Sequence, residues 1–186
     1  MLRFYDYPLR LRQTAVSDVY RIHQQIDTLM QEGFDYRLPY CWHHQPSVIP
    51  GASEVLVRTA IPVTLPGQHM TELTLAEDMD LSFSVRMFGA SKLSAGGMRE
   101  STKEDHLRRL PSSLKMAGFE LICATFGSTE TFFVHKPGVK PFPLPGHDAV
   151  LTVTITDVAL ASQALVHGIG RRKVFGCGML RDIEVL

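Results

Sequence analysis

The sequence predicts an α+β fold in which two βαββ units follow one another along the chain. Three observations carry this prediction. Bulky and polar residues alternate in several short runs, two longer stretches place apolar residues at helical spacing, and the order of these runs repeats. A chain of 186 residues with 45% hydrophobic content can bury enough apolar surface for two small domains.

The first unit opens with an alternating strand over residues 3–12. A helix follows, capped by Ser17 or Asp18 and ended by Gly33. Its apolar positions at helical spacing are Val16, Val19, Ile22, Ile26, Leu29 and Met30. Two strands are then predicted at 36–43 and 54–61, and one more at 70–75. The link over residues 62–68 is too short for a second helix, so this unit is abbreviated.

The second unit repeats the order after Asp80. Strand 81–88 and helix 101–116 lead to a predicted hairpin, 119–126 and 130–135, which turns at Gly127 and Ser128. The remaining elements are a proline-rich surface loop at 137–146, a β-branched strand at 150–155, a helix capped by Asp157 and a closing strand at 181–186. The two units predict tandem ferredoxin-like (RRM-like) domains with antiparallel sheets, over residues 1–78 and 79–186.

Composition excludes several classes of protein. The chain carries 19 basic and 19 acidic residues, so binding to nucleic acid by net charge alone is not expected. Three separated cysteines without a Cys-x-x-Cys pair indicate neither a disulfide framework nor a zinc knuckle. The sequence has no apolar run of membrane-spanning length and no secretory signal at its start. We therefore expect a soluble cytoplasmic protein without a membrane partner.

The most informative segment is His-Gly-Ile-Gly-Arg-Arg-Lys-Val-Phe-Gly-Cys-Gly-Met-Leu, residues 167–180. It combines Gly168, Gly170, Gly176 and Gly178 with Arg171, Arg172 and Lys173. Glycines let a backbone approach a phosphate closely, and the three cations can neutralise it. The segment follows a helix rather than a strand and lacks Gly-Lys-Ser/Thr, so neither a Rossmann turn nor a Walker loop is indicated. From spacing alone, a simple bend before the last strand is an equal alternative.

The segment resembles the carboxyl-terminal motif of CRISPR-associated repeat-processing endoribonucleases of the CasE (Cse3) type. The resemblance continues in the same order through most of the chain. It includes the first-helix segment 18–24 (Asp-Val-Tyr-Arg-Ile-His-Gln), segment 83–92 with its spaced Arg86 and Lys92, and segment 114–122 (Leu-Lys-Met-Ala-Gly-Phe-Glu-Leu-Ile). The abbreviated first unit and Met87-Phe88-Gly89, where the family has a polar run containing proline, leave the subtype open between type I-E and another class such as type IV.

The resemblance implies that His23 is the catalytic residue and that Tyr20 assists it. Metal-free RNA cleavage has the ribose 2′-hydroxyl attack its own phosphate, and this reaction needs a proton acceptor and a proton donor. Imidazole titrates near neutrality and can serve in either role, so whether His23 is acid, base or both stays open. Asp27, one turn later, could orient the imidazole. Without the resemblance, a histidine on a helix edge is more often structural or solvated.

The resemblance also implies RNA-binding residues and partners. The basic helix and hairpin of the second domain are expected to grip the repeat stem-loop, and other cations to hold backbone near the cut. The expected RNA-binding residues are Arg86, Lys92, Arg108, Arg109, Lys115, Lys136, Lys140, Gly168, Gly170, Arg171, Arg172, Lys173, Gly176 and Gly178. The implied partners are the CRISPR repeat RNA, as precursor and product, and other subunits of a class 1 effector complex.

Three functional hypotheses remain at this point. The first is a metal-independent endoribonuclease that cuts CRISPR precursor RNA at the base of a repeat hairpin and stays bound to the product. The second is a hairpin-binding subunit without activity. The third is a small nucleotide- or metal-dependent enzyme that uses the glycine segment or Cys41, His43 and His44. No zinc-spaced partner follows these three residues, so we expect neither a metal nor a cofactor.

Overall fold

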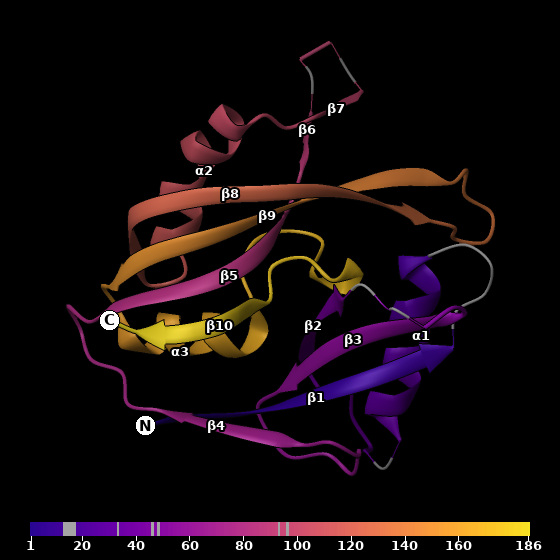
Figure 1. The fold of residues 1–186 in the computed structure, drawn as a ribbon, viewed down its shortest axis with the longest axis horizontal. Helices are drawn as coiled ribbons and strands as arrows, with labels where there is room; N and C mark the ends of the chain where they lie inside the picture. Colours follow the sequence, from indigo (N-terminus) through magenta and orange to yellow (C-terminus); the bar gives the residue numbers. More distant parts are fainter. Residues whose placement is uncertain (13–17, 33, 46, 48, 93, 96) are drawn as a thin grey trace.

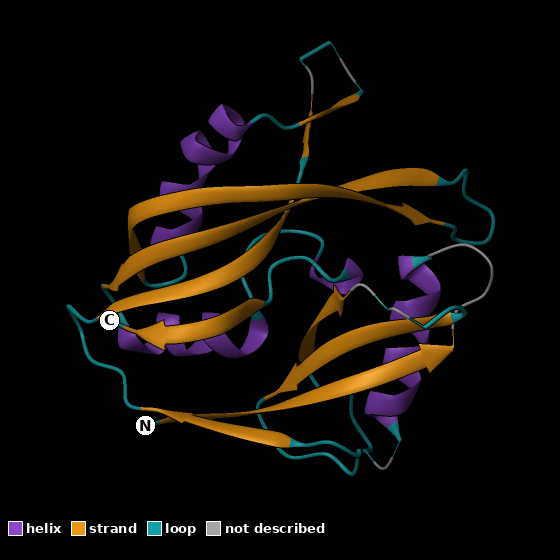
Figure 2. Ribbon diagram, viewed as in Figure 1, coloured by secondary structure: helices purple, strands orange, loops and turns teal. Residues whose placement is uncertain are grey.

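The first half of the chain forms a four-stranded antiparallel sheet covered by one helix (Figures 1 and 2). The computed structural model describes residues 1–12, 18–32, 34–45, 47, 49–92, 94–95 and 97–186. The first sheet has the order β2-β3-β1-β4. Its strands are β1 (Leu2–Arg12), β2 (Tyr40–Gln45), β3 (Ala52–Thr59) and β4 (His69–Leu73), and its helix is α1 (Val19–Gln31).

Helix α1 begins where Asp18 accepts a hydrogen bond from the backbone N–H of Tyr20, a standard N-cap. Its apolar stripe, Val19, Ile22, Ile26 and Met30, is buried against the first sheet. This confirms the helical spacing read from the sequence. The predicted Ser17 cap and the stop at Gly33 lie outside the described residues.

The second half forms another four-stranded antiparallel sheet, in the order β10-β5-β9-β8. Its strands are β5 (Asp80–Phe88), β8 (Phe119–Val134), β9 (Phe142–Ile155) and β10 (Leu180–Val185). Helices α2 (Lys103–Lys115) and α3 (Val158–His167) pack on one core with this sheet. Helix α3 also contacts β2 and β3, so it lies between the two sheets (Figure 1). The α+β, tandem ferredoxin-like prediction is thus confirmed, with the first unit lacking its second helix among the described residues.

Three local predictions were wrong. The expected hairpin at Gly127 and Ser128 does not turn: β8 runs on to Val134 with an irregular register between Phe126 and Thr129, because a bulge absorbs the extra residues. The second strand begins at Tyr40 rather than at residue 36. A small hairpin of β6 (Ala90–Lys92) and β7 (Met98–Glu100) was not predicted.

The proline-rich segment is also a strand in part, because β9 begins at Phe142. Pro145 turns its carbonyl toward the β5 side, where it accepts a hydrogen bond from the Gly89 N–H at 2.7 Å. The nitrogen and carbonyl of one residue point to the same side of a strand, so Pro143 and Pro145 remove no donor from the pairing with β8. Proline is therefore tolerated here, and the surface-loop prediction fails for this stretch.

The two halves interlock through a long arm formed by the far ends of β8 and β9. Phe132, Val134 and Leu144 of this arm join the first core, as does Cys177 from near the end of the chain. Helix α1 meets the arm where the Asp18 carboxylate accepts a hydrogen bond from the backbone N–H of His135. The boundary between residues 78 and 79 remains a prediction, and residues from beyond it complete the first core. No described helix combines the length and the apolar character that crossing a membrane requires.

Candidate active site and RNA interface

The first candidate site lies on the edge of α1 beside its buried stripe. His23 and Asp27 are one turn apart on this edge, and both are half-buried. Tyr40, the first residue of β2, extends its side chain to the same place. Its hydroxyl oxygen lies 3.0 Å from Nδ1 of His23 and 3.2 Å from Oδ1 of Asp27. Arg37 completes the row, with its guanidinium 3.3 Å from the same carboxylate oxygen.

The hydrogen-bond chain determines which ring nitrogen of His23 carries the proton. A carboxylate only accepts, so the single hydroxyl proton of Tyr40 is donated to Asp27. The hydroxyl oxygen then accepts a hydrogen bond from Nδ1–H of His23. This tautomer leaves the lone pair on Nε2, the ring nitrogen turned away from Tyr40. The site is arranged to accept a proton at one defined atom.

The pKa values of these groups follow from their surroundings. Burial lowers the pKa of His23, Asp27 acts to raise it, and Arg37 lowers it. The imidazole is therefore neutral at neutral pH and available as a base. Burial and the neighbouring Asp27 raise the pKa of Tyr40, so its hydroxyl keeps its proton.

Tyr20, predicted to assist His23, packs at the edge of the first core. Among the described residues, no hydrogen bond joins its hydroxyl to His23. Its role stays a prediction. Tyr40 is the partner that the sequence analysis missed, because it lies 17 residues from His23 and no local spacing relates a helix edge to the start of a later strand.

The glycine-rich segment is a closed loop after α3, with a 3-10 turn, η1 (Lys173–Phe175), that contacts α1 and β2 (Figure 1). Its two ends cross, and the Ile169 N–H donates to the Gly178 carbonyl at 2.8 Å. Gly168 and Gly178 both have positive φ, 74° and 86°. A Cβ on Gly178 would collide with the Ile169 carbonyl, and one on Gly168 would lie 2.6 Å from the Gly178 carbonyl oxygen. These glycines are required by the crossing itself.

Other positions in the loop face outward. Arg171 and Arg172 are exposed, and each lies near the face of Phe88, with guanidinium carbons 5.9 and 5.5 Å from the ring centre. Lys173 is half-buried, and its ammonium lies 3.4 Å from the Gly168 carbonyl. Gly170 has open space around it, whereas Gly176 packs against the Trp42 ring. The loop therefore offers Gly170, Arg171 and Arg172 to a ligand, and keeps its other glycines for its own shape.

Arg86, also predicted to bind RNA, is only 4% exposed. Two of its nitrogens lie 3.0 Å from the two carboxylate oxygens of Asp148, and Nη2 is 3.1 Å from Glu130. Nη1 donates to the His44 carbonyl at 3.3 Å. These contacts favour a structural role in joining the second sheet to β2. Lys92 lies in β6, and its side chain is outside the described residues.

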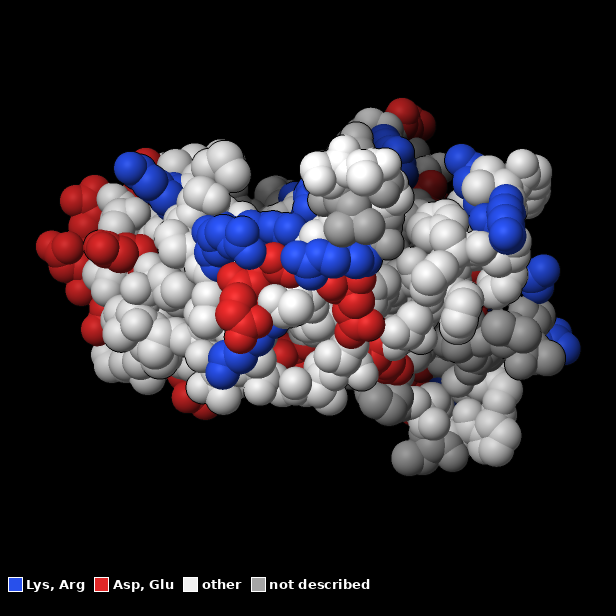
Figure 3. All heavy atoms as spheres, turned by 90° about the horizontal axis from the view of Figure 1, so that it is seen from above, with Lys and Arg blue, Asp and Glu red and all other residues white. Residues whose placement is uncertain are grey.

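The basic residues of α2 differ in their surroundings. Arg108 is exposed and paired with Asp105 at 2.7 Å, whereas Arg109 is half-buried and donates to the Ser91 hydroxyl. Lys115 is exposed in the last turn of α2. Figure 3 shows cations interleaved with acidic side chains across the middle of this face. The predicted basic helix is thus partly neutralised by its own carboxylates.

Lys136 and Lys140 are exposed in the connection between β8 and β9. The arm that carries this connection reaches α1, so the two lysines lie at the same end of the molecule as the helix start. Figure 3 shows a separate group of cations toward this end, and acidic side chains gathered at the opposite end. On this face, the cations lie in the middle and toward the end that holds α1, and the opposite end is acidic.

The alternative metal ligands are buried in the protein interior. The Cys41 thiol donates to the Val166 carbonyl at 3.1 Å, and burial raises its pKa to about 12. His43 and His44 are 3% and 8% exposed, and burial lowers their pKa values to about 2 and about 4. Among the described residues, no three histidine, cysteine or acidic side chains come together as a metal site. These residues serve the packing between the two sheets.

The chain was compared with protein families and with solved structures, and both comparisons find CRISPR-associated proteins. Residues 135–181 match the model of a family described as CRISPR associated protein. The CRISPR endoribonuclease Cse3 bound to a 19-nucleotide RNA superposes with a TM-score of 0.72 at 18% identity, over 100% of this chain and 99% of that chain. The fold is that of Cse3.

Two further structures agree. Thermus thermophilus Cse3 bound to an RNA representing a pre-cleavage complex gives a TM-score of 0.72 at 17% identity, over the whole of both chains. The CRISPR-associated protein Cas6e from Escherichia coli K-12 gives 0.67 at 18% identity, over 99% of this chain and 98% of that one. No curated protein sequence matches the chain significantly. The predicted resemblance is confirmed in fold, and the fold is Cse3-like over the whole length of the chain.

Proposed function

We propose that this protein is a metal-independent endoribonuclease that cuts CRISPR precursor RNA at the base of a repeat stem-loop. The observation that carries the proposal is the fixed imidazole of His23, presented at the edge of α1 on a Cse3-like fold. The named structural relatives support the choice of RNA, since one is an endoribonuclease bound to RNA and another represents a pre-cleavage complex.

The proposed chemistry uses residues that the site already holds. Nε2 of His23 accepts the proton of the ribose 2′-hydroxyl, whose oxygen attacks the adjacent phosphorus and displaces the 5′-oxygen of the next nucleotide. The leaving 5′-oxygen takes a proton from the His23 imidazolium or from water, and the products are a 2′,3′-cyclic phosphate and a 5′-hydroxyl. Tyr40 and Asp27 stabilise the imidazolium that forms, because Nδ1–H already points at the tyrosine oxygen. Tyr20 is proposed to assist from the neighbouring turn.

The cations serve binding in this proposal. Arg109 of α2, Arg171 and Arg172 of the loop, and Lys136 and Lys140 near α1 hold RNA phosphates, and Arg108 and Lys115 contact the stem. RNA helices are recognised by shape and phosphates, which suits dispersed cations on a chain of zero net charge. After cleavage the protein stays on the product as a subunit of an effector complex. The structural match to a chain of a CRISPR RNA-guided surveillance complex supports this last step.

The test is cleavage, in excess chelator, of the repeat RNA from the CRISPR array that neighbours the gene for this protein. We expect His23→Ala to lower the single-turnover rate by about 10² to 10⁴ while hairpin binding is kept, because a general acid–base group is lost. A matched control is His69→Ala, since His69 is an exposed histidine on β4. A 2′-deoxy sugar at the cut should block the reaction.

Each other outcome selects a different function. Binding without cleavage by the wild-type protein would favour the hairpin-binding subunit. Loss of cleavage in chelator would contradict the metal-independent mechanism. Equal rates for His23→Ala and the wild-type protein would remove His23 from the chemistry.

A further inference from the structure

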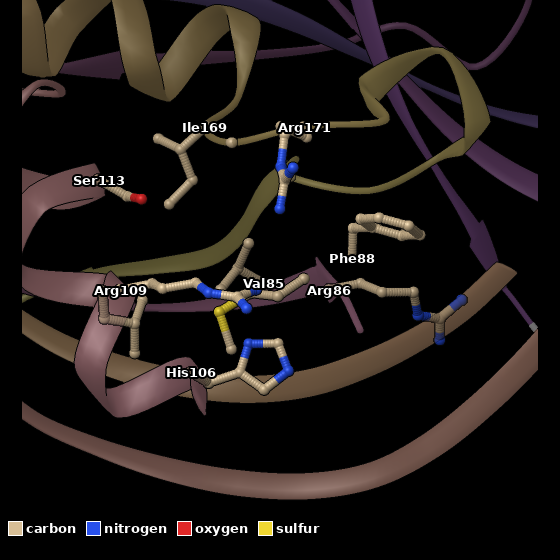
Figure 4. Close-up of a pocket in the computed structure, with 12 residues that line it drawn as sticks. Val85, Arg86, Phe88, His106, Arg109, Ser113, Ile169 and Arg171 are labelled. Carbon is tan, nitrogen blue, oxygen red and sulfur yellow. The ribbon is translucent and has the colours of Figure 1, made fainter. Parts of the chain in front are cut away.

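A cavity of about 110 Å³ lies where α2, the end of β5 and the glycine-rich loop meet. Helix α2 contributes His106, Arg109, Leu110 and Ser113, residues spaced so that they lie on one helix face. Strand β5 contributes a second wall, formed by Val85, Arg86, Met87 and Phe88. The loop contributes the third wall, formed by Ile169, Gly170, Arg171 and Gly178. Figure 4 shows this cavity with its polar groups on opposite sides.

The cavity is cationic and lacks a counter-charge. None of the described residues that line it is acidic. Arg109 and Arg171 have no carboxylate partner among the described residues, and the one side-chain hydrogen bond of Arg109 goes to Ser91. Figure 4 shows both guanidiniums directed toward the cavity from different elements, whereas that of Arg86 points away. Two uncompensated guanidiniums that face one space are suited to bind a phosphate.

The rest of the lining is suited to contact a nucleobase. Val85, Met87, Leu110 and Ile169 form apolar walls, and Phe88 supplies an aromatic face. His106 is 4% exposed, and its Nε2 has no hydrogen-bond partner among the described residues. Burial, together with His147 and Arg109, lowers the pKa of His106 to about 4, so the ring is neutral at pH 7. A buried, neutral and unpaired nitrogen in a binding cavity calls for a polar ligand atom.

The cavity continues into a second hollow of about 500 Å³ between α2 and α3. The two spaces share Ser113, Ile169, Gly170 and Arg171. The second adds His167 and Lys173, and its described lining is also free of acidic residues. The two adjoining spaces therefore line the glycine-rich loop with basic side chains, and the larger one lies on the α3 side.

We propose that this cavity binds one unpaired nucleotide of the RNA, with its phosphate between Arg109 and Arg171 and its base against the wall that carries Phe88. His106 and Ser113 then offer hydrogen bonds to the base, and the strand continues into the larger space past Lys173. The inference rests on the proposed RNA substrate and adds a binding pocket distant in sequence from His23. The pocket holds RNA and takes no part in the proton transfer.

The experiment uses the His23→Ala protein, which keeps the RNA intact, and the repeat RNA of the neighbouring array with one abasic site at each unpaired position. We expect one position at which the abasic site weakens binding roughly tenfold, because a stacked base is lost. In a background of Ser113→Trp, which fills the cavity, the same abasic site should have no further effect. Ser112→Trp is the matched control, because Ser112 is the exposed neighbour on α2.

A second arm tests the phosphate. A neutral methylphosphonate is placed on the 5′ side of the sensitive nucleotide. It should weaken RNA binding by the protein that keeps Arg171. It should not change the affinity of the Arg171→Ala protein for the RNA. Arg171 is exposed, so this substitution keeps the fold. The proposal is overturned if Ser113→Trp binds the RNA as tightly as Ser112→Trp does. It is also overturned if every abasic site weakens the Ser113→Trp protein as much as its parent.

A third arm distinguishes RNA from a free nucleotide. The four nucleoside 5′-monophosphates and inorganic phosphate are added to the RNA-free protein, and the melting temperature is followed. A rise with a monophosphate, without any position-specific abasic effect, would assign the cavity to a free nucleotide and overturn the RNA assignment. All three arms measure binding, and the proposed mechanism is tested separately by cleavage. If the His23→Ala protein cleaved RNA in that test, the proposed mechanism would be contradicted, but the binding results for the cavity would still stand.

Discussion

Two pairs of arginines in this protein have opposite surroundings. Arg58 is 3% exposed, meets both carboxylate oxygens of Asp6 at 2.7 Å, and donates to the carbonyls of Leu165 and Leu180. Arg86 is enclosed in the same way by Asp148 and Glu130. Arg109 and Arg171 border a cavity without a carboxylate partner among the described residues. The first pair joins the two sheets, and the second is left for a ligand.

The role of each arginine depends on whether a carboxylate pairs with its guanidinium. Arg86 and Arg171 are equally prominent in the sequence, and both were predicted to bind RNA. Only the three-dimensional position of Asp148, 62 residues further along the chain than Arg86, separates them. Stability and ligand binding are thus assigned to different arginines of the same chain.

The substitution that should cost the most stability breaks the buried ion pair of Arg58 and Asp6. Arg58→Met should lower the free energy of unfolding by about 3–5 kcal/mol, because Asp6 is left with an unpaired, mostly buried charge. Urea unfolding measures it. Arg10→Met is the control, because Arg10 pairs with Glu54 at the surface and should cost less than about 1 kcal/mol. Equal losses in the two variants would remove the distinction between buried and exposed pairs.

A smaller effect separates positioning from packing at the α1 edge. Tyr40→Phe keeps the ring but removes the acceptor for Nδ1–H of His23. We expect a rate loss of about tenfold, in line with a hydrogen bond of about 1.4 kcal/mol. The apparent pKa of His23 should fall further, because the imidazolium loses a partner, so the midpoint of the pH–rate profile moves to lower pH.

Single-turnover cleavage between pH 4 and 8 reports both quantities. Tyr20→Phe is the comparison, since the structure gives Tyr20 no hydrogen bond to His23 among the described residues. It should leave the midpoint unchanged. A Tyr40→Phe protein with the wild-type rate and midpoint would show that Tyr40 only packs.

The smallest effect concerns the histidines between the sheets. His44 has a folded pKa of about 4, below its ordinary value of 6.5. The unfolded chain therefore binds its proton first, and stability is full above pH 6.5 and falls as the pH drops toward 4. The loss should be at most about 1.4 kcal/mol per pH unit. His44→Gln should flatten this dependence, measured as urea midpoints from pH 7 to 4.5, and an unchanged slope would contradict the burial of a neutral ring.

Much of the fold could be predicted because short-range patterns govern it. The apolar stripe of α1 and the Asp18 and Asp157 caps act within one or two turns, and the structure has them. Features that depend on distant partners could not be predicted. Strand β8 passes through Gly127 and Ser128 because it pairs with β9, which overrides the local turn preference.

The candidate site shows the same division. His23 was found through its helix and the resemblance of that helix to a family motif. Its hydrogen-bond partner Tyr40 was not, because only the folded chain brings the start of β2 to that helix edge. The cavity beside Arg171 was likewise invisible, since it needs α2, β5 and the loop together.

The prolines of β9 have a consequence for how the molecule behaves among its own copies. Between Phe142 and Leu144 this strand pairs with β8 on one side, and its other side is a sheet edge. The residue whose nitrogen points outward there, Pro143, carries no N–H, and at Pro145 the outward carbonyl is already bonded to the Gly89 N–H. An incoming strand finds no donor on this short edge, which disfavours the formation of a ladder. The arm that fastens the two halves together is thereby protected against pairing with a neighbouring molecule in a crowded solution.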